Sequence, residues 1–149
     1  FKIDLGRLKV DQLGFVFRDI EKQAKIMEEM FGIPQFMIFP AVEFPTKYKG
    51  TDSHLKARAA FSRLGDTQVE LIQWIEGKSP YKDFLDQGRE GLHHIGIYVD
   101  DVDPYISELD KMGIEVLFYG ELGDGKFAYM DTEQTFGIIV EFILRPQNR

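Results

Sequence analysis

The sequence predicts an α+β fold in which two tandem βαβββ modules form a curved, cup-like mixed sheet with helices on the outside. The first observation is an internal repeat, because residues 11–33 (DQLGFVFRDIEKQAKIMEEMFGI) are similar to residues 93–116 (HHIGIYVDDVDPYISELDKMGIEV). The second is a pair of similar late strands, TQVELIQW at 67–74 and IIVEFILR at 138–145. Repetition of a strand, a helix and a late strand indicates two copies of one unit that share a core.

The first module, residues 8–75, begins with a strand and a helix. Residues 12–17 are rich in β-branched and aromatic side chains, and apolar residues recur at helical spacing over 20–31. Asp19 is placed to cap this helix at its N-terminus, and Gly32 to end it.

The first module continues with two strands joined by a tight turn. A strand over KARAAFSRLG (56–65) leads through Gly65-Asp66 into the strand at 67–74. The preceding region, 39–56, is polar and contains Pro and Gly, so we expect a mobile loop there, with a lid as one role for it.

A linker helix over residues 76–91 precedes the second module, residues 92–146, within a single domain that spans 1–149. Ser79 is expected to cap the linker helix and Pro80 to begin it. In the second module, Asp103 is expected to cap a helix that begins at Pro104, and strands over KFAYMDTE and IIVEFILR follow.

Composition excludes several classes of function. The chain has no cysteine, so disulfides, thiolate nucleophiles and Cys-based zinc sites are excluded, and a cytoplasmic location is expected. The net charge is −7 and no basic cluster is present, so we expect no nucleic-acid partner. No apolar run approaches the roughly 20 residues of a membrane span, so no membrane partner is expected.

Four polar side chains are expected to meet on one face of the sheet. Strand alternation places His94 on the face opposite Ile95 and Ile97, and each late strand carries one carboxylate among apolar residues. A buried, unpaired carboxylate is costly, so two at matching repeat positions require a common explanation. One divalent metal ion supplies it, and this N/O ligand set suits Zn, Ni, Co, Fe or Mn. The candidate ligands are Gln12, Glu70, His94 and Glu141.

Each of these residues also has a simpler interpretation when taken alone. A single Glu in an edge strand is usually solvated, and a lone strand His is more often a hydrogen-bonded core residue than a ligand. Alternation points His93 to the apolar side, so we assign it a structural role. His54 lies in the polar region and is expected to be exposed, with a contact to substrate as the alternative.

The paired modules, GLHHIGIYVDDVD (91–103) and GIIVEFI (137–143) resemble the vicinal oxygen chelate superfamily over residues 8–146. This superfamily includes glyoxalase I, methylmalonyl-CoA epimerase, extradiol dioxygenases and bleomycin-resistance proteins. The segment SPYKDFLDQGREGLHHIGIYVDDVD (79–103) is most similar to methylmalonyl-CoA epimerases. The resemblance implies a metal-dependent enzyme of small acyl-CoA or 2-oxo substrates, commonly a homodimer.

In the epimerase pattern, Glu70, His94 and Glu141 match metal-ligand positions. Gln12 departs from the pattern, because epimerases usually carry His there and some glyoxalase I enzymes carry Gln. Epimerases with two catalytic glutamates have the second on the third strand of the first half, where this chain has Ala59 or a neighbour. The resemblance therefore leaves two-base epimerisation unsupported by a matching residue.

Two alternatives follow from the same resemblance. A glyoxalase I-like lyase fits the ligand set, but Val16, Trp74 and Glu90 replace the residues that bind glutathione in glyoxalases. A non-catalytic binding protein of the bleomycin-resistance type is the other alternative, whereas a dioxygenase needs two His ligands. Our expectation is an isomerase or lyase that removes a proton next to a carbonyl, with Glu141 as base and Glu70 as the second catalytic carboxyl group.

Overall fold

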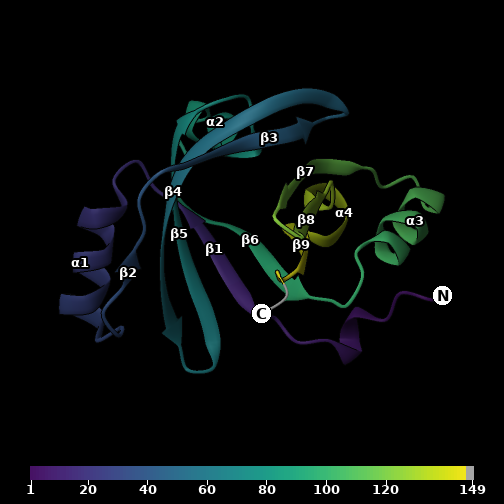
Figure 1. Ribbon diagram of the computed structural model, residues 1–149. Helices are drawn as coiled ribbons and strands as arrows, with labels where there is room; N and C mark the ends of the chain where they lie inside the picture. The colour runs from purple at the N-terminus through teal and green to yellow at the C-terminus, as the bar shows by residue number, and fades with distance from the viewer. Residues whose placement is uncertain (147–149) are drawn as a thin grey trace.

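The described part of the chain, residues 1–146, forms one nine-stranded mixed sheet that curves into a cup in the computed structural model (Figure 1). Its strands are β1 (Gln12–Val16), β2 (Met37–Ile38), β3 (Val42–Tyr48), β4 (Thr51–Leu64), β5 (Thr67–Glu76), β6 (Gly91–Tyr98), β7 (Val116–Leu122), β8 (Gly125–Met130) and β9 (Ile139–Leu144). Its helices are the 3-10 turn η1 (Leu5–Arg7), α1 (Ile20–Phe31), α2 (Pro80–Asp86), α3 (Asp103–Lys111) and α4 (Glu133–Phe136).

The two modules have the same strand order and are joined along two edges. The order is β1-β5-β4-β3 in one module and β6-β9-β8-β7 in the other. The antiparallel pairing of β1 with β6 makes one joint, and the antiparallel pairing of β3 with β7 makes the second. Because both joints form, the sheet closes on itself, with β2 as an additional strand on β4. The predicted α+β fold with two βαβββ modules and a cup-like sheet is confirmed.

The helices begin where their capping residues predict, with one small shift. The Asp19 side chain accepts a hydrogen bond from the Lys22 amide at the start of α1, and Ser79 does the same for Lys82 in α2. Helix α3 begins at Asp103, one residue earlier than expected. The shift follows from Asp101, whose side chain accepts from the Asp103 amide at 3.0 Å and so holds the first turn.

The expectation of a mobile loop and lid over residues 39–56 is wrong. This region contains β3 and the first half of β4, which pair over their length and turn at Lys49-Gly50, where φ is 52° and 77°. The polar residues of β3 lie on its outer face, while Phe44, Thr46 and Tyr48 point inward. Polar composition therefore marked the solvent side of a hairpin rather than a loop.

Apolar residues fill both sides of the sheet. Outside it, α1 covers β4 and β5, and α3 packs against β9; the two helices lie on opposite flanks of the cup (Figure 1). Inside it, an aromatic cluster joins the strands to α2 through Tyr81, Phe84, Phe118 and Tyr129. No helix in residues 1–146 is both long and apolar enough to span a membrane. The strand faces that the sequence assigned to the helices are those that the helices cover.

Candidate metal centre

The four predicted ligands lie on two rungs that cross the paired strands β1 and β6. On one rung Glu70 of β5 pairs with Gly14, and Gly14 pairs with His94. On the other rung Gln12 pairs with Gly96 of β6, and Gly96 pairs with Glu141 of β9. Each rung therefore carries one carboxylate, one central glycine and one nitrogen-bearing side chain, as expected for a duplicated module.

The two glycines leave the space that the ligand side chains occupy. A Cβ atom on Gly14 would lie 2.1 Å from Cε1 and Nε2 of His94. A Cβ atom on Gly96 would lie 3.1 Å from Cβ and Oε1 of Gln12. A larger residue at either glycine would displace the side chain opposite, and the conflict is greater at Gly14.

The side chains of both rungs meet at His94. Its Nε2 atom lies 3.2 Å from Oε1 of Glu141 and 3.8 Å from Oε1 of Glu70. His94 is fully buried, Gln12 and Glu141 are each 5% exposed, and the Glu70 side chain is 16% exposed. The structure therefore brings His94, Glu70 and Glu141 into one cluster, and Gln12, Glu70 and Glu141 line the cavity beside it.

Burial shifts the pKa values of this cluster toward the neutral forms. Desolvation, with a smaller effect of the Glu141 charge, raises the pKa of Glu70 to about 8. Burial also raises the pKa of Glu141 well above its usual value and lowers that of His94 to about 3. Three groups that are destabilised when charged thus lie together within the fold.

The donor set fits a divalent cation. Oε1 of Glu141 is buried and has no hydrogen-bond partner among the described residues. A buried oxygen without a partner is destabilising, and a cation between the carboxylates and the imidazole would remove that cost. Two carboxylates, an imidazole and an amide oxygen form an N/O set of the kind that binds divalent metals.

Two residues that sequence analysis did not identify hold the Gln12 amide. Gln12 donates from Nε2 to Oε1 of Gln68 at 2.7 Å, and the same oxygen accepts from the Tyr98 hydroxyl at 2.9 Å. Since its nitrogen is engaged, the amide oxygen of Gln12 is the atom left for a ligand. Gln68 and Tyr98 are each on the strand face of a predicted ligand, Gln68 two residues before Glu70 and Tyr98 four after His94, so strand alternation could have identified them.

Two tyrosines complete the wall of the cavity beside the cluster. The hydroxyl groups of Tyr81 and Tyr129 lie 2.5 Å apart, and that of Tyr129 is 3.3 Å from Nε2 of His94. Tyr129 pairs with Glu141 across β8 and β9, which places it over the site. The cavity has a volume of about 370 Å³ and its remaining wall is mainly apolar, with Phe39, Phe44, Phe61, Phe127 and Ile143 among its residues. It suits a ligand with one polar end and an apolar body.

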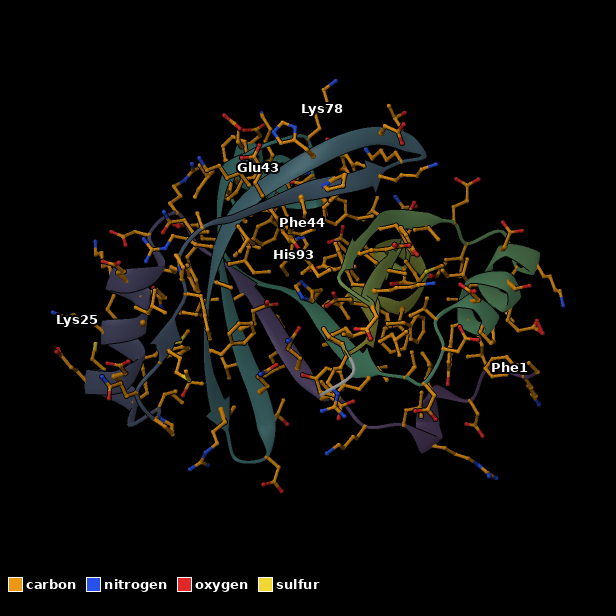
Figure 2. The ribbon with its side chains drawn as sticks, viewed as in Figure 1. Phe1, Lys25, Glu43, Phe44, Lys78 and His93 are labelled. Atoms are coloured by element: carbon orange, nitrogen blue, oxygen red, sulfur yellow. The ribbon has the colours of Figure 1, made fainter. Side chains whose placement is uncertain are left out.

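His93 is buried, as expected, but it does not lie on the face opposite His94. The β1–β6 pairing shifts register here, because Gly14 pairs with His94 while Phe15 pairs with Leu92. His93 is thus the extra residue of a β-bulge, which interrupts strand alternation. The two imidazole rings are in contact, with their Nδ1 atoms 3.0 Å apart. Figure 2 shows His93 in the interior of the cup.

His54 lies outside this site, on the outer face of β4. It is exposed, as expected, and its Nε2 atom is 3.5 Å from Glu43 and 3.3 Å from Glu76. The ligand atoms of these three exposed residues lie within 4.8 Å of one another. Glu43 marks this outer surface in Figure 2. Because β3 and β4 are strands rather than a lid, His54 is not placed to contact a substrate in the cavity.

Residues 11–129 match the family model of the Glyoxalase/Bleomycin resistance protein/Dioxygenase superfamily. The chain belongs to this superfamily. The match covers most of the chain and includes β1, β6 and β8, on which Gln12, His94 and Tyr129 lie. The family resemblance seen in the sequence is thereby confirmed.

Individual members of the superfamily are more distant. The mitochondrial methylmalonyl-CoA epimerase of Homo sapiens is 29% identical over 115 residues, which is 76% of this chain and 58% of the human protein. The uncharacterized protein YqjC of Bacillus subtilis is 24% identical over 136 residues and 89% of each chain.

Solved structures of the superfamily share the fold. Methylmalonyl-CoA epimerase from Mycobacterium tuberculosis has a TM-score of 0.66 at 14% identity, over 92% of this chain and 87% of that one. An S. coelicolor (Streptomyces coelicolor) epimerase in complex with 2-nitronate-propionyl-CoA has a TM-score of 0.67 at 18% identity, over 92% and 94% of the two chains. At these identities the likeness is one of fold.

Proposed function

We propose that this chain is a metal-dependent enzyme that removes a proton from the carbon next to a carbonyl, as an isomerase of the methylmalonyl-CoA epimerase type. The observation that carries the proposal is the carboxylate of Glu141. It is buried, one of its oxygens has no hydrogen-bond partner within the described residues, and it faces a cavity beside a neutral histidine. A carboxylate in this setting is a stronger base than one in water.

The metal would be held by Gln12, Glu70, His94 and Glu141, through the amide oxygen, two carboxylates and Nε2. When bound, a divalent cation supplies electrostatic stabilisation to the substrate oxygen that gains negative charge as the proton leaves. The ligand types are compatible with Zn, Ni, Co, Fe or Mn and do not select among them.

The proton would be taken by Glu141, a step for which a well-placed base contributes about 10²–10⁴-fold. Return of a proton to the opposite face of the carbon requires a second acid, and Glu70 is the titratable residue of the ligand set that remains. Ala59 lines the same cavity at the position where two-base epimerases carry a glutamate. We therefore expect proton exchange to be faster than inversion in this chain.

An acyl thioester is the proposed substrate class. Support comes from the human relative, which is a methylmalonyl-CoA epimerase, and from the Streptomyces structure with an acyl-CoA analogue bound. The apolar wall of the cavity offers contact to the acyl group and its arm, and the ligand cluster at its base would receive the carbonyl end.

Deuterium exchange at the α-carbon of methylmalonyl-CoA in D₂O, followed by NMR, tests the proposal. Wild-type protein loaded with Co²⁺ or Zn²⁺ should exchange this proton, and Glu141→Gln should lower the rate by at least about 10²-fold. A Glu76→Gln variant, altered outside the cavity, serves as the control. Metal-loaded protein that binds the thioester without exchange would instead indicate a binding protein, and protein that binds no metal would reject the proposal.

A further inference from the structure

We propose that His93 is a positioning residue that fixes the tautomer of His94. In this arrangement His93 accepts a hydrogen bond from Nδ1–H of His94, so that the Nε2 lone pair of His94 faces Glu70 and Glu141. The inference deepens the proposed function, since it rests on Nε2 of His94 as the metal-binding atom.

The β-bulge in β6 makes this contact possible. Adjacent residues of a regular strand point to opposite faces, and their side chains do not meet. At the bulge, His93 is the unpaired residue opposite β1, and its ring lies 5.2 Å from that of His94. The Nδ1 to Nδ1 distance of 3.0 Å is that of a hydrogen bond, so one of these nitrogens is the donor and the other the acceptor.

The partner of His93 on its other side determines the direction of this bond. His93 also makes a hydrogen bond to the backbone of Pro80. Proline has no amide N–H, so its backbone can only accept, and His93 must be the donor in that bond. A neutral imidazole carries a single N–H. With that proton directed to Pro80, Nδ1 of His93 is left as an acceptor and Nδ1 of His94 must donate.

The surroundings of His93 favour a neutral ring in one orientation. It is 5% exposed and packs against Phe84 and Tyr81 of α2, with ring centroids 4.9 and 5.4 Å away. An imidazole enclosed by apolar rings is destabilised when protonated. Helix α2 thus holds His93 both by packing and through the carbonyl group of its first residue.

The consequence lies at the other nitrogen of His94. Its Nε2 atom carries the lone pair at 3.2 Å from Glu141 and 3.8 Å from Glu70, where a cation would bind. The Tyr129 hydroxyl, 3.3 Å away, is the donor available to this lone pair when no cation is bound. The opposite tautomer would place a proton at Nε2 and would require His93 to give up its bond to Pro80. Metal-binding histidines generally hold their second N–H in such a fixed hydrogen bond.

The tautomer can be measured in the wild-type protein by ¹⁵N NMR of the imidazole rings, without metal. The expected spectrum shows His94 protonated at Nδ1 and His93 protonated at Nε2. A His94 ring protonated at Nε2 would overturn the inference. Because this experiment needs no variant and no metal, it separates the inference from the proposed function, which fails instead if the wild type binds no cation.

Two variants test the consequence for metal affinity, measured by calorimetric titration with Zn²⁺. His93→Phe keeps a ring but has no acceptor, and we expect a 10- to 100-fold loss of affinity, as is usual when such a partner is removed. His93→Asn places an oxygen near the position of Nδ1 and should recover most of the loss. Equal affinity of wild type and His93→Phe, or no recovery in His93→Asn, would contradict the role. If His93→Phe does not fold, His93→Asn and the wild-type spectrum still decide the question.

Discussion

Gly14 of β1 lies directly across from His94 of β6, and the imidazole ring fills the space that a side chain on Gly14 would need. The partner rung repeats this arrangement with Gly96 and Gln12. In each rung, a ligand from one module is accommodated by a glycine from the other. The candidate metal centre is therefore built by the joint between the modules rather than by either module alone.

Gly14→Ala should abolish metal binding, because its Cβ atom would lie 2.1 Å from two atoms of the His94 ring. Overpacking of a well-packed site typically costs about 1–3 kcal/mol, so a lower melting temperature is also expected. Calorimetric Zn²⁺ titration and thermal denaturation measure the two effects. Gly96→Ala is the matched control: its nearest atoms are side-chain ends and a Cβ at 2.9–3.1 Å, so a smaller loss is expected. Equal losses in both variants would contradict this account.

The stability of the metal-free protein should fall as pH rises from about 6.5 to 8. The pKa of Glu70 is raised from 4.5 to about 8, and that of Glu141 is also raised, so the folded state binds more protons than the unfolded state in this range. The free energy of unfolding then decreases with pH, by at most about 1.4 kcal/mol per unit for each carboxyl group. Melting temperatures measured across this range test the sign, and Glu70→Gln should reduce the slope.

Below pH 6.5 the histidines act in the opposite direction. The pKa of His94 is lowered from 6.5 to about 3 and that of His93 is also lowered, so the unfolded state binds the additional protons. Their effect offsets that of the carboxyl groups between about 4.5 and 6.5 and destabilises the fold as pH falls further. A stability maximum in this interval is expected, and saturating Zn²⁺ should stabilise the protein more at pH 8 than at pH 5. A melting temperature that rises steadily up to pH 8 without metal would argue against the buried carboxyl pair.

Gln68→Leu should weaken metal binding about 10- to 100-fold, because the Gln12 amide would lose the partner that orients it. Gln68→Glu keeps an acceptor for Nε2 of Gln12 and is expected to bind metal more tightly than the Leu variant. Tyr98→Phe removes the second bond to Gln68 while leaving Gln12 in contact, so its effect should be smaller. Calorimetry on the three proteins gives the order, and an unaffected Leu variant would show that Gln12 does not bind through its oxygen.

Ala59→Glu should increase inversion relative to proton exchange. Ala59 lines the cavity, so a carboxyl group there could protonate the substrate from a second direction. A well-placed acid contributes about 10²–10⁴-fold, and a gain of about tenfold in the ratio of the two rates is expected from an unoptimised one. NMR in D₂O measures exchange, and polarimetry on methylmalonyl-CoA measures inversion. If Ala59→Gln gives the same ratio, proton donation is not the cause.

The parts of the fold that depend on local signals were predictable from the sequence. Capping by Asp19 and Ser79 and the apolar periodicity of α1 and α3 involve residues close together in the chain. Alternation along the strands also placed Glu70 and Glu141 on the inner face, because both strands are regular there. Repetition then related one module to the other, so that four residues far apart in sequence could be assigned to one site.

The features that were missed depend on neighbouring strands. The bulge at His93 is a property of the β1–β6 pairing, and alternation within β6 alone predicts the opposite orientation. The hairpin of β3 and β4 was hidden because its outer face is polar. Gln68 and Tyr98 acquire their role only once β1, β5 and β6 are side by side, so neither carries a signal in its own segment.

The closed ring of strands also bears on how this protein behaves at high concentration. An open sheet presents unpaired backbone groups at its rims, and these can recruit a strand from another molecule. Within residues 1–146, every strand except the two-residue β2 has a neighbour on both sides along part of its length. The second joint, between β3 and β7, therefore removes most of the surface through which fibrillar aggregation could begin.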